Sequence, residues 1–108
     1  MRDGLYKVQF KTPLGDGAGV AYLAGGKMHG GDSMIFYVGT YAEDGGQFTA
    51  SVQTDAHSSV PSMASVFGVS KASINLKGTS EGDKATMQGS SPQAPGVSFS
   101  ATLTRIAD

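Results

Sequence analysis

Two short stretches of the chain place a histidine near a carboxylate, the pairing that a metal site or an acid–base catalyst uses. His29 lies three residues before Asp32, and Asp55 lies two residues before His57. Zinc sites take three or four ligands, but the chain has only two histidines and no cysteine. We therefore expect no metal site. Asp55 and His57 should be solvated where a strand runs into a loop, and His29, beside two glycines, should belong to a turn.

A glycine-rich run over residues 15–19 has the composition of a phosphate-binding loop, which needs a helix after it. Residues 20–23 are instead typical of a strand, and no Gly-Lys-Ser/Thr follows. The run is therefore predicted to be a flexible hairpin. No serine lies in a Gly-x-Ser-x-Gly elbow, and neither histidine is placed to act as its base. The sequence indicates no enzyme and no cofactor.

The adjacent acidic residues Glu43 and Asp44 occupy the tip of a predicted hairpin between Tyr41 and Phe48. One interpretation is a solvated turn. The other is an acidic contact for a basic protein partner, in which exposed carboxylates would speed association more than they add affinity. The residue types alone leave both open.

Composition limits the classes of protein to which the chain can belong. At 108 residues it fits one domain, spanning residues 1–108. Its net charge of −1, with no basic run, argues against binding to nucleic acid. The absence of cysteine suits a reducing compartment. No stretch reaches the ~18 apolar residues of a membrane span, and no signal-peptide core follows Met1, so we expect a cytoplasmic protein.

Several segments alternate apolar and polar residues with the period of a half-buried strand. The clearest are residues 6–11, 47–53 and 97–104, and weaker candidates are residues 20–24, 27–29, 34–41, 72–77 and 84–89. The apolar positions predict an inner face made of Tyr6, Val8, Phe10, Phe48, Ala50, Val52, Ile74, Leu76, Val97, Phe99 and Leu103. A barrel interior of this kind either is filled by side chains or holds one small apolar ligand.

The connections between these segments favour antiparallel neighbours. Short turns rich in glycine and acidic residues occur at residues 25–26, 43–46 and 81–83. A parallel sheet would need crossover helices, and only residues 61–67 offer a short helix. Closure into a barrel would also remove exposed strand edges. The fold predicted is an all-β, eight-stranded antiparallel barrel with at most one short helix.

Short motifs spread over most of the chain carry a likeness to a known family. They are residues 1–10 (MRDGLYKVQF), Gly17-x-Gly19, Gly30-Gly31-Asp32, Tyr37-x-Gly39-x-Tyr41 and Ser65-Val66-Phe67-Gly68. In this order and spacing they resemble the GrlR-like negative regulators of bacterial type III secretion. The resemblance implies a lipocalin-like (calycin-like) eight-stranded barrel that dimerises, encloses an apolar cavity and sequesters a transcriptional activator.

The resemblance also implies a site for the partner. The acidic stretch of the type member matches Glu43-Asp44-Gly45-Gly46, where two of the four acidic positions are glycine in this chain. We therefore expect a non-enzymatic, homodimeric regulator that binds a protein partner, a transcriptional activator, through Glu43 and Asp44. The alternative is a protein that holds a small, lipid-like apolar ligand in the barrel interior.

Overall fold

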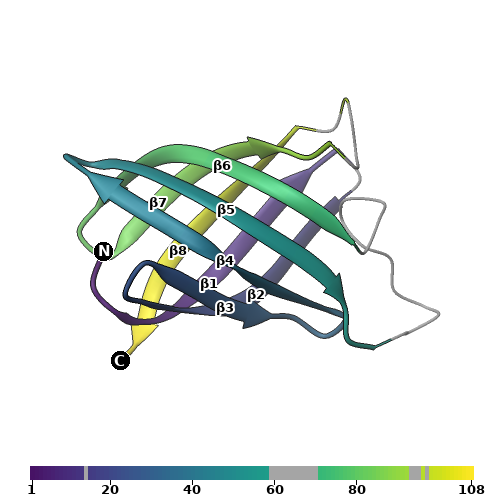
Figure 1. The fold of residues 1–108 in the computed structure, drawn as a ribbon, viewed down its shortest axis with the longest axis horizontal. Helices are drawn as coiled ribbons and strands as arrows, with labels where there is room; N and C mark the ends of the chain where they lie inside the picture. The colour runs from purple at the N-terminus through teal and green to yellow at the C-terminus, as the bar shows by residue number, and fades with distance from the viewer. Residues whose placement is uncertain (14, 59–70, 93–95, 97) are drawn as a thin grey trace.

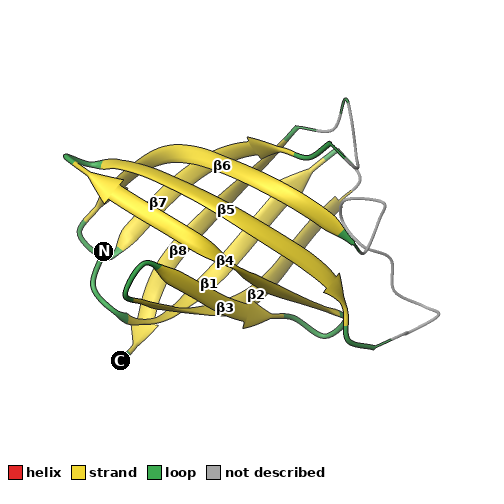
Figure 2. Cartoon of the chain, in the orientation of Figure 1, coloured by secondary structure: helices red, strands yellow, loops and turns green. Residues whose placement is uncertain are grey.

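The computed structural model of the chain describes residues 1–13, 15–58, 71–92, 96 and 98–108 (Figure 1). They form eight strands: β1 (Gly4–Thr12), β2 (Gly15–Ala24), β3 (Lys27–Gly31), β4 (Ile35–Asp44), β5 (Gln47–Ala56), β6 (Ala72–Glu81), β7 (Lys84–Ser90) and β8 (Phe99–Ala107). Among these residues there is no helix, and so none that could span a membrane (Figure 2). The helix predicted over residues 61–67 lies outside the described residues.

Each strand pairs antiparallel with the next, and β1 pairs with β8 to close the barrel. The register places Phe10 of β1 between Gly17 of β2 and Ala101 of β8. Because the ring closes, each of the eight described strands has a hydrogen-bonded neighbour on both sides. The predicted all-β, eight-stranded antiparallel closed barrel is confirmed.

Glycines make the tight hairpins at one end of the barrel. Gly25-Gly26 joins β2 to β3 with φ of 59° and 81°, and Gly45-Gly46 joins β4 to β5 with φ of 58° and 85°. Positive φ at both central residues is the geometry that matches strand twist in a two-residue hairpin. The prediction of short glycine turns holds at these places, although Glu43 and Asp44 themselves end strand β4.

The glycine-rich run over residues 15–19, predicted to be a flexible hairpin, is one arm of the β1–β2 hairpin and not its turn. It forms the first half of β2, with Gly15 opposite Thr12 and Gly19 opposite Val8 of β1. Glycine has a low intrinsic strand preference, but pairing with a neighbouring strand overrides it. His29 was likewise predicted in a turn and lies within strand β3, where its side chain is exposed.

The core is the inner side of the barrel wall, and the strands alternate between buried and exposed residues. Of the predicted inner face, Tyr6, Val8, Phe10, Phe48, Ala50, Val52, Ile74, Leu76, Phe99 and Leu103 are buried. Val97 lies outside the described residues. The strands that were predicted less clearly add Ala21, Leu23, Met28, Ile35, Tyr37, Ala72, Ala85 and Met87, and β8 adds Ala101.

Candidate interaction surfaces

The barrel interior is filled. The space left at its centre is about 30 Å³, and its lining is apolar except for the Tyr37 hydroxyl and Thr54. Phe10 and Tyr37 meet edge to face across it, with ring centroids 5.4 Å apart. A void of this size has room for about one or two water molecules. A lipid-like ligand would therefore require the core side chains to move apart.

The two residues of the acidic pair have different surroundings. The Glu43 carboxylate forms an ion pair with the N-terminal ammonium of Met1 and accepts a hydrogen bond from the Ser80 hydroxyl. The Met1 ammonium, and after it the Ser80 hydroxyl, hold the pKa of Glu43 below its usual value. Asp44, the next residue, is exposed at the end of β4. The structure therefore ties Glu43 to the barrel end and leaves Asp44 facing solvent.

This difference predicts that substitutions of Glu43 and Asp44 have different effects on the stability of the fold. Glu43→Gln should lower the free energy of unfolding at pH 7 by about 1 kcal/mol or less, because a partly exposed ion pair is screened by solvent. Asp44→Asn should leave it within about 0.5 kcal/mol of the wild type, as for other surface substitutions. Thermal denaturation of the two variants beside the wild type measures both.

The effect of Glu43→Gln should depend on pH. A carboxyl whose pKa is lower in the folded than in the unfolded chain stabilises the fold above its unfolded pKa, about 4.3 for Glu. That contribution is lost as the pH falls through the folded pKa. The difference in thermal midpoint between Glu43→Gln and the wild type should therefore shrink towards pH 3. A constant difference from pH 7 to pH 3 would mean that the Glu43 charge contributes nothing.

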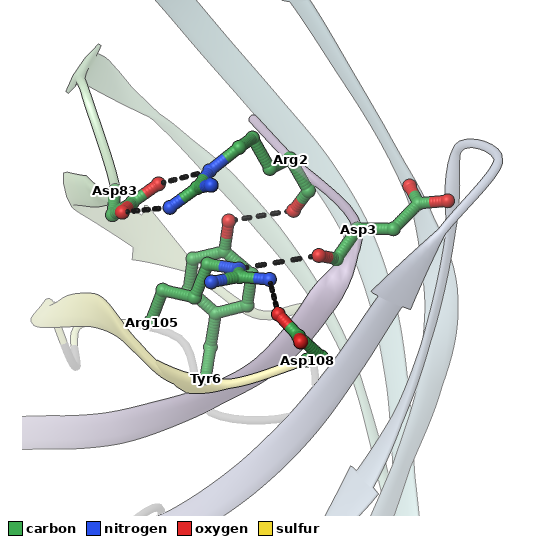
Figure 3. A network of polar contacts seen from close by, with 6 residues as sticks. All are labelled: Arg2, Asp3, Tyr6, Asp83, Arg105 and Asp108. Carbon is green, nitrogen blue, oxygen red and sulfur yellow. Dashed lines mark hydrogen bonds and ion pairs between the residues drawn. The ribbon is translucent and has the colours of Figure 1, made fainter.

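A set of polar contacts that the sequence did not predict holds the N-terminal segment across the same end of the barrel (Figure 3). The Arg2 guanidinium donates to both carboxylate oxygens of Asp83, at 3.0 and 2.6 Å. The Tyr6 hydroxyl donates to the Arg2 carbonyl at 2.7 Å, and Arg105 donates to the Asp3 carbonyl at 3.2 Å. The Arg2 contact lowers the pKa of Asp83. These groups serve to close the barrel end.

At the opposite end, Asp32 organises the connection from β3 to β4. One carboxylate oxygen accepts hydrogen bonds from the backbone N–H groups of Met34 and Ile35, both at 2.9 Å. The other accepts one from the Tyr37 hydroxyl at 2.6 Å. Burial, and then this hydrogen bond, raise the pKa of Tyr37 well above its usual range, so the phenol stays protonated. The Asp32 carboxylate thus stabilises the connection between β3 and β4.

The histidine–carboxylate pairs seen in the sequence do not form catalytic dyads. His29 is on the outer wall of β3, whereas the Asp32 carboxylate bonds Tyr37. His57 donates from Nε2 to the backbone oxygen of Asp32 at 2.8 Å, and Asp55 accepts a hydrogen bond from the N–H of Ala56. Within the described part of the chain, no group of three or more His, Cys, Asp or Glu residues could hold a metal ion.

The outer wall carries an apolar surface that the sequence analysis missed. Val20 and Tyr22 of β2 are each 43% exposed, and Phe36 and Val38 of β4 are 38% and 36% exposed. The short strand β3 lies between them. We call this surface the β2–β4 face; it consists of Val20, Tyr22, His29, Gly31, Phe36 and Val38.

The sequence does contain a signal for this face. In β2 and β4, apolar residues occupy the exposed positions as well as the buried ones, as in the run Ile35-Phe36-Tyr37-Val38. A strand that is apolar on both sides either is covered or presents an apolar surface to solvent. The period-two argument considered only the inner positions, so this second set was overlooked.

Comparison with known proteins adds no relative. A scan against models of known protein families matches none of them, and a search of curated proteins finds no similar sequence. The structure itself shows an eight-stranded antiparallel closed β-barrel with a filled interior and an apolar outer face.

Proposed function

We propose that this chain is a non-enzymatic bacterial regulatory protein of the GrlR-like kind, which acts in the cytoplasm by contact with a protein partner. The observation that carries the proposal is the filled interior, whose central cavity measures about 30 Å³. A barrel with so little internal space works most directly through its outer surface. The eight-stranded closed barrel agrees with the architecture that the resemblance implies.

The hairpin between β4 and β5 is the proposed contact with the partner. It presents the exposed Asp44 beside Glu43, whose side chain keeps 31% of its surface accessible despite its internal contacts. Asp44 faces solvent next to the tight turn at Gly45-Gly46, and the Glu43 carboxylate is held beside it by Met1 and Ser80. Such a site suits a basic partner, and its charge would act mainly on the rate of association.

Surface plasmon resonance against a partner isolated from the host tests this proposal. Asp44→Asn should slow association severalfold at low salt and reduce its dependence on salt, because one steering charge is gone. Asp16→Asn is the matched control, since Asp16 is an exposed carboxylate at the other end of the barrel. If both variants associate at the wild-type rate, the hairpin is not the contact.

The alternative, a carrier of a small apolar ligand, requires the interior to open. The apolar lining favours it, and the volume of about 30 Å³ speaks against it. Native mass spectrometry of protein purified from its own host separates the two functions. A retained lipid-like mass would support the carrier, whereas the mass of the bare chain would support a protein that acts from its surface.

A further inference from the structure

A groove follows the outer surface of three neighbouring strands, β4, β5 and β6 (Figure 1). It consists of two adjoining hollows of about 310 and 460 Å³. The second begins where the first ends, from Val38 to Thr40 on β4 and from Ser73 to Asn75 on β6. We call it the β4–β6 groove; it is formed by the outward side chains of residues 36–42, 49–55 and 71–77.

The two walls of the groove differ in chemistry. The β4 wall is mostly apolar, with Phe36 and Val38 exposed at one end and Ala42 at the other. The opposite wall carries two exposed lysines, Lys71 just before β6 and Lys77 within it. Neither lysine forms an ion pair within the described part of the chain. A ligand in the groove would therefore meet apolar side chains on one flank and cations on the other.

The floor of the groove, strand β5, supplies hydrogen-bonding groups. Its outward side chains include Thr49, Ser51 and Gln53, which make no side-chain hydrogen bond to any other residue that the structure describes. Hydroxyl and amide groups both donate and accept, so they can bond the N–H and C=O groups of another chain. A helix already pairs its own backbone groups, whereas an extended chain leaves them open. The floor therefore suits an extended peptide.

The width of the groove also favours an extended chain. β4 and β6 are separated by two strand spacings, about 9.5 Å. A helix with its side chains is about 10–12 Å across and would rest on the walls without reaching the floor. An extended peptide is narrower, and it can turn alternate side chains to opposite walls. Lys71 and Lys77 are six residues apart, an even number, so side chains from one edge of such a peptide reach both lysines.

We propose that the β4–β6 groove binds an extended segment of a partner protein in which apolar and acidic side chains alternate. The apolar side chains would pack on Phe36 and Val38, which removes exposed apolar surface from water. The carboxylates would face Lys71 and Lys77, which lie about 20 Å apart along the strand. The groove is a surface separate from the acidic β4–β5 hairpin, and its proposed ligand does not depend on the contact proposed there.

Fluorescence anisotropy with a labelled peptide tests this proposal. The probe is a seven-residue peptide of alternating glutamate and valine with blocked ends, which spans the two lysines when extended. The comparison peptide has lysine in place of each glutamate. The glutamate peptide should bind at least tenfold more tightly than the lysine peptide, because only its charges complement the β6 wall. Equal affinities, or no saturable binding of either peptide at millimolar concentration, would overturn the proposal.

Charge reversal on the β6 wall locates the bound peptide. Lys77→Glu should weaken binding of the glutamate peptide severalfold, and Lys71→Glu should do so less, because Asp55 lies in the same hollow as Lys71. Lys7→Glu is the matched control, since Lys7 is exposed on β1, the strand opposite β5 in the ring. The double variant Lys71→Glu/Lys77→Glu should prefer the lysine peptide. If Lys77→Glu and Lys7→Glu bind equally well, the peptide does not occupy the groove.

Substitutions of apolar residues test the other wall. Val38→Ser should lower the affinity for the glutamate peptide severalfold, whereas Val20→Ser, on exposed β2, should leave it unchanged. Asp44→Asn should also leave it unchanged, so failure of the groove and failure of the hairpin contact can be told apart. Circular dichroism checks that each variant has folded. Peptide binding that disappears as the protein self-associates in sedimentation would assign the groove to a second copy and overturn the proposal.

Discussion

Phe48→Ala is expected to lower the free energy of unfolding by about 3–5 kcal/mol, the cost of truncating a fully buried aromatic residue. The Phe48 side chain is 0% exposed and stacks on Tyr41, with ring centroids 5.6 Å apart and planes 12° from parallel. Its register partner on β6 is Gly78, which has no side chain to fill the space. The cavity left by the ring would therefore stay open, and the lost contacts would not be replaced.

Urea denaturation of Phe48→Ala beside Thr49→Ala measures this effect. Thr49 is the next residue of β5 and points to the outer wall, so its truncation should change the unfolding free energy by less than about 0.5 kcal/mol. The slopes of the two transitions should be equal if both variants unfold from the same barrel. Equal midpoints would mean that the two faces of β5 are assigned the wrong way round.

The strand pattern of this fold could be predicted because one wall residue in two is buried. Alternation identified the buried positions of β1, β5, β6 and β8, and glycine turns indicated antiparallel order. The alternation was weaker in β2, because Gly15, Gly17 and Gly19 have no apolar side chain to mark the inner face. Only pairing with β1 makes that segment a strand, and pairing is a property of the folded chain.

The state of the interior could not be derived from the same pattern. Alternation says which side chains point inward, but the empty volume depends on how residues such as Tyr37, Met87 and Phe99 interdigitate. From the sequence, the interior of this small barrel could therefore be either filled by side chains or open to one small apolar ligand. In the described part of the chain the central cavity measures about 30 Å³.

The sites that involve charge depended on contacts between distant parts of the chain. Glu43 was predicted as a free acidic residue, but its partners are Met1, 42 residues away, and Ser80, 37 residues away. The bond from Arg2 to Asp83 spans 81 residues, and that from Arg105 to Asp3 spans 102. No local spacing rule reports such pairs, so their discovery required the closed barrel.

Gly78→Ala should destabilise the barrel by at least about 1–3 kcal/mol, the cost of forcing an extra methyl group into a packed wall. A Cβ at this position would lie 1.9 Å from the carbonyl oxygen of Thr86 and 2.7 Å from the Cα of Met87. Both are backbone atoms of β7, so no side-chain rotation relieves the contact. The arc of β6 in Figure 1 shows where the wall bends over the interior. A glycine inside a strand commonly marks such a close backbone approach.

The matched control for Gly78→Ala is Thr79→Ala, at the next position of β6, where the side chain is exposed. Thermal denaturation should show a lowered midpoint for Gly78→Ala and a nearly unchanged one for Thr79→Ala. The lower midpoint would follow because β6 and β7 must move apart, which weakens the hydrogen bonds on both sides of Gly78 and Met87. If Gly78→Ala melts at the wild-type temperature, the two strands do not approach as closely as the register requires.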